Sequence, residues 1–318
     1  MGASIGRSQA CLRLQDDPSF FSLRWAIPYD FSYNQIINDT VIQSPANIVL
    51  VRFWVHWGLV CLALLLAIVT FIAQSIKPAR YGRHEKHTGR LYVPQRLAHI
   101  LSDGIPGVLF FSVIYFVFGR NFANPVNIVF YCLFTNHFIH RSAIHPLLMR
   151  YGNSRVSLFI PVANVVANLP FHYINADFIG SVCYYPVYYY DPRFVIGVIL
   201  FVIGFVINRS ADSYLAYLRC SKAKYEINSD RKVFDKENGG KYFVSECCLF
   251  KLVVNPNYLG EGIEWFGWAI ATWSLSGLVW WSFTMATFIP RSRHNLKWYR
   301  SNFPDFPKYR RGLIPLIW

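Results

Sequence analysis

Long apolar runs, separated by shorter polar stretches, dominate the chain after its first 46 residues. A helix that crosses a bilayer needs about 20 mainly apolar residues, and several runs reach or approach that length. They are Ile48 to Ala73, Leu97 to Phe118, Val126 to Met149, Val156 to Ile174, Phe194 to Tyr217 and Trp265 to Ile289. The pattern therefore predicts an all-α fold, a polytopic bundle of transmembrane helices.

The distribution of positive charge predicts the orientation of this bundle, because loops rich in Lys and Arg stay in the cytosol. The loops after the first, third and fifth runs are basic, which places the N-terminus in the lumen. The tail from Arg291 to Arg311 is basic too, so the C-terminus belongs in the cytosol and the number of crossings is odd. We expect about seven spans, with two short ones between Val244 and Ile289, the first beginning near Cys248.

Composition supports one membrane domain. Residues 1–46 contain no signal-peptide pattern and are expected to form a lumenal segment, and residues 47–318 a single integral-membrane domain. The residues AVILMFWYC make up 54% of the chain, and only 15% are charged, which is too apolar for an ordinary soluble domain. The net charge of +14 lies mostly in loops beside the spans, so we expect the bilayer as partner and no nucleic acid. No obligate protein partner is indicated.

Neither the cysteines nor the histidines have the spacing of a metal site. The seven cysteines are scattered, and the adjacent pair Cys247-Cys248 lacks metal-ligand spacing. His137, His140 and His145 gather in the third run, but membrane di-iron oxygenases use several histidine clusters, and no two histidines are adjacent here. We expect no metal.

Polar side chains recur at helical spacing in the later runs. Asn208 and Asp212 are four residues apart and share a helix face, and Arg219 returns to nearly the same face. Two further faces follow: Asn257, Glu261, Glu264 and Trp265, and then Arg291, Asn295 and Tyr299. Ionisable residues inside a membrane usually mark a functional site. The alternatives are a network that packs helices together and, for the last face, a solvated basic interfacial helix.

A cavity with this lining could hold a phosphorylated, polyhydroxylated ligand. Amides and carboxylates suit ribose hydroxyls and a carboxamide, whereas arginines suit phosphates. The sequence has no Rossmann fingerprint, because Gly260-Glu261-Gly262 is not followed by glycine at the required spacing and lies in no βαβ pattern. Any nucleotide is therefore expected within the helical bundle.

Several motifs resemble the steroid 5α-reductase family. The C-terminal ones are Pro256 to Glu261, Glu264-Trp265, Ala271 to Leu275 and Leu313 to Pro315. Sparser ones upstream are Tyr81 to His84, His140-Arg141, and Asn208 with Asp212. The resemblance extends over roughly residues 77–318 and is densest in a signature at 242–318.

The resemblance implies a seven-helix enzyme of the endoplasmic reticulum membrane that transfers a hydride from NADPH to the β-carbon of an enone and then protonates the α-carbon. The expected substrate is a lipophilic 3-oxo-4-ene steroid or a sterol-like lipid. The NADPH contacts that the family implies are Asn208, Asp212, Arg219, Tyr242, Asn257, Glu261, Trp265, Arg291, Asn295 and Tyr299. The alternatives are a polyprenol or enoyl-CoA reductase of the same superfamily, a membrane methyltransferase and a non-enzymatic lipid-binding protein.

The chain departs from the family pattern at the substrate end. Where the family has a glutamate that binds the substrate carbonyl, the nearest residue is Asp103. A carboxyl in an apolar helix tends to stay neutral, so Asp103 is expected to donate a hydrogen bond to that carbonyl. The family's tyrosine is replaced by Phe138, which cannot donate, and His137 or His140 is expected to substitute. The expected catalytic residues are therefore Asp103, His137 and His140.

Overall fold

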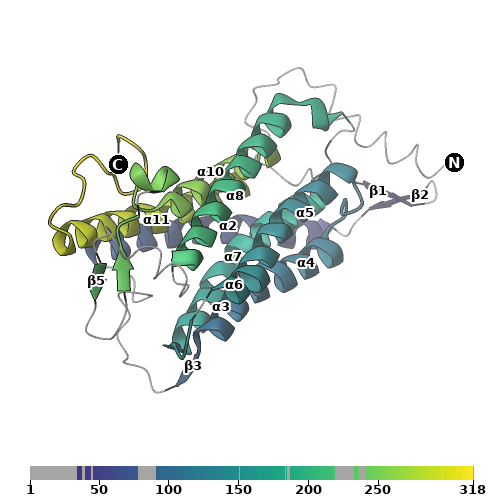
Figure 1. Ribbon diagram of the computed structural model, residues 1–318. Helices are drawn as coiled ribbons and strands as arrows, with labels where there is room; N and C mark the ends of the chain where they lie inside the picture. Colours follow the sequence, from purple (N-terminus) through teal and green to yellow (C-terminus); the bar gives the residue numbers. More distant parts are fainter. Residues whose placement is uncertain are drawn as a thin grey trace.

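The computed structural model describes side chains at 51–77, 91–149, 151–182, 184, 187–218, 244–245 and 247–317, and the backbone alone at 34–37, 40–43, 46–50, 233–235 and 241–243. Seven long helical segments make up this part of the chain (Figure 1). They are α2 (Ala46–Ile76); α3 (Gln95–Gly104) continued by η3 (Ile105–Phe110), α4 (Phe111–Val113) and η4 (Ile114–Phe118); α5 (Pro125–Ile139) continued by η5 (His140–Ile144) and α6 (His145–Leu148); α7 (Phe159–Ser181); α8 (Pro192–Leu218); α10 (Pro256–Thr272); and α11 (Leu275–Asn302).

Short elements join these helices. Two are 3₁₀ turns, η6 (Tyr188–Tyr190) and η7 (Cys248–Lys251). The strands form antiparallel pairs: β1 (Asn34–Ile37) with β2 (Thr40–Gln43), β3 (Tyr92–Pro94) with β4 (Arg155–Ser157), and β5 (Val233–Asp235) with β6 (Lys241–Phe243). The prediction of an all-α bundle is confirmed, because the strands are only short pairs, one before the first helix and the others between helices.

The bundle has the outer surface of a membrane protein. Val51–Ile76, Gln95–Phe118 and Pro192–Leu218 are long and apolar enough to cross a bilayer. Large apolar side chains such as Ile199, Val202 and Val206 are exposed along α8. Since the interior of a bilayer is as apolar as these side chains, lipid accounts for their exposure, and the chain is a multi-pass membrane protein.

The last apolar run divides at a different place from the one expected. Residues 248–251 form only the short turn η7, and α10 begins at Pro256. The break falls at Trp273, whose φ of 48° is left-handed and ends α10. Ser274 then caps α11, since its side chain accepts a hydrogen bond from the Gly277 N–H at 2.9 Å. Trp265 to Ile289 is therefore two helices, and a serine N-cap within the run separates them.

Glycines bring α8 and α10 into backbone contact, and the two helices lie side by side in Figure 1. A Cβ added at Gly204 would lie 2.2 Å from the backbone nitrogen of Glu264, and one at Gly260 would lie 2.4 Å from that of Asn208. Small residues allow membrane helices to approach this closely. The contact sets the polar face of α8 directly against that of α10.

A buried ion pair fixes α2 to α7 on another side of the bundle. Arg52 Nη2 lies 2.5 Å from Asp177 Oδ1, and His56 Nδ1 lies 2.8 Å from Asp177 Oδ2. Asp177 is fully buried, so its charge depends on these partners. Between this pair and the α8–α10 contact lies an aromatic core that includes Phe134 and Trp268, with ring centroids 5.2 Å apart.

We predict that Gly204→Ala lowers the stability of the folded protein by about 1–3 kcal/mol, the usual cost of overpacking a tight contact, because the new methyl group meets the backbone of α10. Gly58→Ala on α2 is the matched control, since nothing lies within 4 Å of its added Cβ. Thermal unfolding in detergent measures both. Equal unfolding temperatures for the two variants would show that α8 and α10 are not held this closely.

Candidate active site

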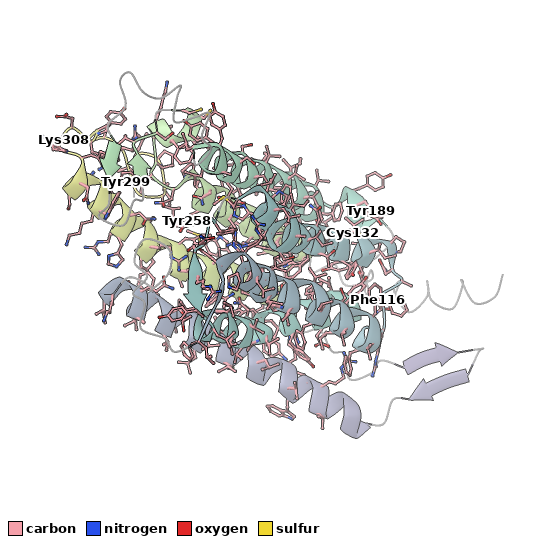
Figure 2. All side chains as sticks on the ribbon, turned by 60° about the horizontal axis from the view of Figure 1, so that its bottom comes forward. Phe116, Cys132, Tyr189, Tyr258, Tyr299 and Lys308 are labelled. Atoms are coloured by element: carbon pink, nitrogen blue, oxygen red, sulfur yellow. The ribbon has the colours of Figure 1, made fainter. Side chains whose placement is uncertain are left out.

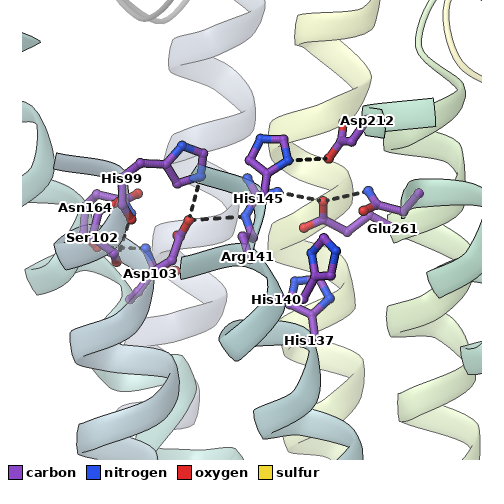
Figure 3. Close-up of polar contacts among 12 residues, drawn as sticks. His99, Ser102, Asp103, His137, His140, Arg141, His145, Asn164, Asp212 and Glu261 are labelled. Atoms are coloured by element: carbon purple, nitrogen blue, oxygen red, sulfur yellow. Dashed lines mark hydrogen bonds and ion pairs between the residues drawn. The ribbon is translucent and has the colours of Figure 1, made fainter. Parts of the chain in front are cut away.

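Charged and polar side chains from α3, η5, α6, α8 and α10 gather in one layer of the bundle (Figure 3). Arg141 lies at its centre. The Arg141 Nε is 3.3 Å from Asp103 Oδ2, and its Nη1 is 3.5 Å from Glu261 Oε2. His145 Nδ1 lies 3.8 Å from Asp212 Oδ2 at the edge of the layer. The guanidinium therefore links the expected substrate-binding residue on α3 to the expected cofactor-binding face on α10.

The third helical segment, α5 with η5 and α6, turns one side toward this layer. His137, Arg141 and His145 are spaced by four residues, so they lie along one side of the helix. The turn between the α-helical parts, η5, is a π-helix, a local widening that occurs frequently at functional sites. Arg141 is part of this turn, and its side chain is partly exposed, at 28%.

The polar faces predicted on α8 and α10 form one hydrogen-bonded network. Asn208 Nδ2 donates to the backbone oxygen of Asn257 at 2.8 Å and to Glu261 Oε2 at 3.2 Å. Asn257 Nδ2 donates in turn to Asp212 Oδ1 at 3.0 Å. Asn208 Oδ1 is buried and has no hydrogen-bond partner among the described residues. Buried amide oxygens are normally satisfied, so this one offers an acceptor to a ligand.

Asp103 has charged and polar neighbours that its apolar sequence context did not reveal. His99 Nε2 lies 3.2 Å from Asp103 Oδ2, and His99 Nδ1 lies 2.9 Å from the Tyr151 hydroxyl. Together with Arg141, these contacts make Asp103 an acceptor in an ion-pair network. The expectation of a neutral, hydrogen-bond-donating carboxyl is therefore wrong, because two basic side chains face it. His99 stands four residues before Asp103, a spacing that could have revealed the pair.

The two histidines proposed as catalytic share one arginine. Arg209 Nη2 is 3.2 Å from His137 Nδ1, and Arg209 Nη1 is 2.9 Å from His140 Nδ1. His137 Nδ1 also lies 2.7 Å from Glu264 Oε1, and Glu264 is fully buried. Sequence reasoning missed Arg209, although a guanidinium in the middle of an apolar helix is itself a functional signal.

Phe138 does not lie in the polar layer. It packs against the rings of His172 and Trp265, and we call these three side chains the aromatic box. Phe138 is 4% exposed, and its ring centroid lies 4.8 Å from that of His172 and 5.9 Å from that of Trp265. Trp265 is fully buried, with its ring 4.6 Å from His137. Trp265 thus joins the core beside the network, and its indole N–H has no hydrogen-bond partner among the described residues. The box offers a lipophilic group an apolar wall next to the charged layer.

A cavity of about 130 Å³ adjoins the network on its other side. Asn257, Asn295 and Tyr299 contribute to its wall, so three of the predicted cofactor residues meet there. Asn295 Nδ2 donates to Asn255 Oδ1 at 2.7 Å, which fixes α11 to the start of α10. Arg291 is partly exposed and does not line the cavity.

Two of the predicted residues cannot be placed against these sites. Arg219 and the side chain of Tyr242 lie outside the described residues. In the part of the chain that is described, no three His, Cys, Asp or Glu side chains form a cluster that could hold a metal ion.

The bundle and its charged layer define the class of the protein as an integral-membrane protein with a polar site between its helices. The family model described as 3-oxo-5-alpha-steroid 4-dehydrogenase matches residues 159–318. A steroid 5-alpha-reductase DET2 of Arabidopsis thaliana is 32% identical over 260 residues, which cover 78% of this chain and 91% of the relative. The chain therefore belongs to the steroid 5α-reductase family, whose members are oxidoreductases that act on CH–CH groups.

Two further relatives agree. A steroid 5-alpha-reductase DET2 of Solanum lycopersicum is 31% identical over 264 residues, which cover 80% of this chain and 94% of that protein. A 3-oxo-5-alpha-steroid 4-dehydrogenase 1 of Mus musculus is 30% identical over 266 residues, which cover 82% and 96%. The similarity to each of the three relatives covers more than three quarters of the chain.

We predict that Asn208→Asp destabilises the protein by about 2 kcal/mol, the scale of an unsatisfied buried polar group. The change replaces the amide donor by a carboxylate that faces Glu261 and a backbone carbonyl, so three acceptors meet. Ser210→Ala, on the exposed side of the same helix, is the control and should unfold like the unchanged protein. Unfolding in detergent with increasing denaturant measures the difference. If Asn208→Asp unfolds at the same denaturant concentration as the control, the network contributes nothing to the stability of the fold.

Proposed function

We propose that this protein is an NADPH-dependent reductase that saturates the C=C bond of an enone, with the 4,5 double bond of a 3-oxo-4-ene steroid or sterol-like lipid as substrate. One observation supports this most directly: Arg141 connects Asp103, at the expected substrate end, to the Asn208–Asn257–Glu261 network, at the expected cofactor end. Its relatives are named for steroid 5α-reduction.

The network suits NADPH by its chemistry. Asn208 Oδ1 is a buried acceptor with no partner in the described residues, and the carboxylates of Asp212 and Glu261 can accept from ribose hydroxyls or a carboxamide. Arg219 and Arg291 are the proposed phosphate ligands, because one guanidinium group can donate two parallel hydrogen bonds to the oxygens of a phosphate. When bound, NADPH supplies the hydride.

At the carbonyl end, we assign Asp103 a positioning role. Its carboxylate faces Arg141 and His99 and holds both in place. Arg141 can donate N–H groups to the substrate carbonyl and stabilise the negative charge that develops on the enolate oxygen. A positive group oriented in advance, in a site that excludes water, stabilises this charge without reorganising during the reaction.

His137 and His140 are proposed as donors in place of the family's tyrosine. Arginine N–H groups only donate, so the contact from Arg209 Nη1 places the lone pair of His140 on Nδ1 and its ring proton on Nε2. That proton is available to a ligand. The aromatic box around Phe138 and Trp265 would then hold the hydrocarbon skeleton of the substrate against the polar layer.

We further propose that the enzyme resides in the endoplasmic reticulum membrane, with its N-terminus in the lumen and its C-terminus in the cytosol. Seven long helical segments in the described chain agree with an odd number of crossings, and the basic tail agrees with a cytosolic end. The candidate cofactor cavity, beside α11 and the segment before α10, would then open toward cytosolic NADPH.

We predict that Asp103→Asn lowers turnover by about 10²- to 10³-fold, the usual loss when one stabilising donor is misplaced, because Arg141 and His99 lose the charge that holds them. NADPH affinity should stay unchanged, and Asp103→Glu should retain most turnover. Ser102→Ala, at the neighbouring position, is the control. Turnover of a 3-oxo-4-ene steroid is measured at saturating NADPH. Full activity in Asp103→Asn would leave Asp103 without a role in the reaction.

We predict that replacing Arg219 and Arg291 together with Ala raises the apparent KM for NADPH by about tenfold or more, the effect of losing charged hydrogen bonds of 1.5–3 kcal/mol. The KM for the steroid should not change. Lys297→Ala removes an exposed charge from the same helix as Arg291 and serves as the control. A KM for NADPH equal to that of the control would contradict the proposed phosphate ligands.

A further inference from the structure

The segment before α10 carries two adjacent cysteines whose sulfur atoms are in contact. Sγ of Cys247 lies 2.9 Å from Sγ of Cys248, and a disulfide bond joins sulfurs about 2.05 Å apart. Bond formation therefore needs an approach of less than about 1 Å. Cys248 is exposed and Cys247 is partly exposed, so a small reagent in solution can reach the pair.

The backbone explains why the two side chains converge. Successive side chains of an extended chain point to opposite sides. Cys247 is extended, with φ −92° and ψ 140°, but Cys248 has a left-handed φ of 49°. This conformation is unfavourable for any residue with a Cβ, yet here it turns the second thiol toward the first. The local fold thus holds the thiols together before any bond forms.

The pair is hydrogen-bonded into the wall of the candidate cofactor cavity. Ser245 and Phe250, on either side of the pair, both line the cavity. The backbone N–H of Cys247 donates to Ser245 Oγ at 3.4 Å, and its backbone oxygen accepts from the Phe250 N–H at 3.0 Å. Arg310, which lines the same cavity, donates to the Ser245 backbone oxygen at 2.8 Å. Hydrogen bonds therefore connect Cys247 to Ser245 and Phe250, and through Ser245 to Arg310.

We propose that Cys247 and Cys248 form a reversible thiol–disulfide switch that responds to low-molecular-weight disulfides and changes the wall of this cavity. The Cys248 thiolate attacks a disulfide R–S–S–R, forms a mixed disulfide and releases one R–S⁻. The Cys247 thiolate then displaces the second R–S⁻ and closes the Cys247–Cys248 bond. The two thiol protons end on two R–SH molecules, so the cysteines are oxidised and the reagent is reduced. Excess R–SH reverses both steps.

Ring closure must alter the segment, because a disulfide between neighbouring residues forms a small ring whose geometry departs from the relaxed one. Strained, exposed disulfides are readily reduced, which suits a reversible regulator. The ring competes with the contact between the Cys247 oxygen and the Phe250 N–H, so Phe250 shifts at the cavity wall. The consequence for NADPH rests on the function proposed above: the oxidised form should bind it more weakly.

The chemistry is tested by mass spectrometry of the purified full-length protein after treatment with glutathione disulfide. The peptide that contains both cysteines should lose two hydrogen atoms, and dithiothreitol should restore them. Cys248→Gly, which suits the left-handed backbone, should never show this loss. Cys132 lies far from Tyr299, a residue of the cavity wall, in Figure 2, so Cys132→Ser should behave as the unchanged protein. A stable glutathione adduct at Cys248, or no reaction, overturns the proposal.

The coupling is tested by hydrogen exchange of residues 244–255 and by NADPH titration of reduced and oxidised protein. Oxidation should change exchange in this segment and weaken NADPH binding by at least about fivefold, a typical coupling between sites, and Cys248→Gly should show neither effect. A disulfide that forms without changing the exchange or the affinity overturns the switch. If neither form binds NADPH, the proposed function fails, and hydrogen exchange alone decides the switch.

Discussion

The structure depends on the close approach of α8 and α10. Four glycines, Gly197, Gly204, Gly260 and Gly267, leave no room for a Cβ at the contact, so the helices meet backbone to backbone. This distance allows the short amide of Asn208 to reach both the Asn257 backbone and Glu261. A larger residue at any of these glycines would separate the two polar faces, and the groups that we assign to the cofactor would no longer form one surface.

The charged layer follows from this contact and from the third helix. Once Glu261 and Asp212 are set side by side, their negative charge needs compensation in a membrane, where an unpaired charge is strongly unfavourable. Arg141 supplies it from η5, where its Nη1 lies 3.5 Å from Glu261 Oε2. Arg141 has a second partner in Asp103. One guanidinium therefore contacts both the face that we propose for the cofactor and the end that we propose for the substrate.

Much of this organisation could be predicted from the sequence. Apolar run length identifies the helices, and the four-residue spacing of Asn208 and Asp212 identifies a face that the structure places against Asn257 and Glu261. These features depend on residues that are close in the sequence and recur at regular spacing, so the sequence pattern predicts them. The division at Trp273 was missed because a single left-handed residue inside an apolar run leaves almost no trace in hydropathy.

The neighbours of Asp103 were missed for a different reason. Hydropathy describes the helix that carries a residue but not the helix that faces it. Arg141 comes from 38 positions further along the chain and approaches only in the folded bundle, so the carboxyl looked isolated. Arg209 is likewise not part of the four-residue pattern of Asn208 and Asp212, and its contacts with His137 and His140 on the facing helix arise only in the fold. In both cases an arginine of the membrane region was the informative residue.

The most direct test of the central claim is an isotope-transfer experiment. Purified protein is incubated with a 3-oxo-4-ene steroid and NADPH in which both hydrogens at the nicotinamide C4 position are deuterium, and the product is analysed by mass spectrometry and NMR. The account predicts a saturated ketone with one deuterium on the former β-carbon and a solvent-derived hydrogen on the α-carbon. A product without deuterium at the β-carbon, or a methylated lipid formed from a methyl donor in place of reduction, would contradict it.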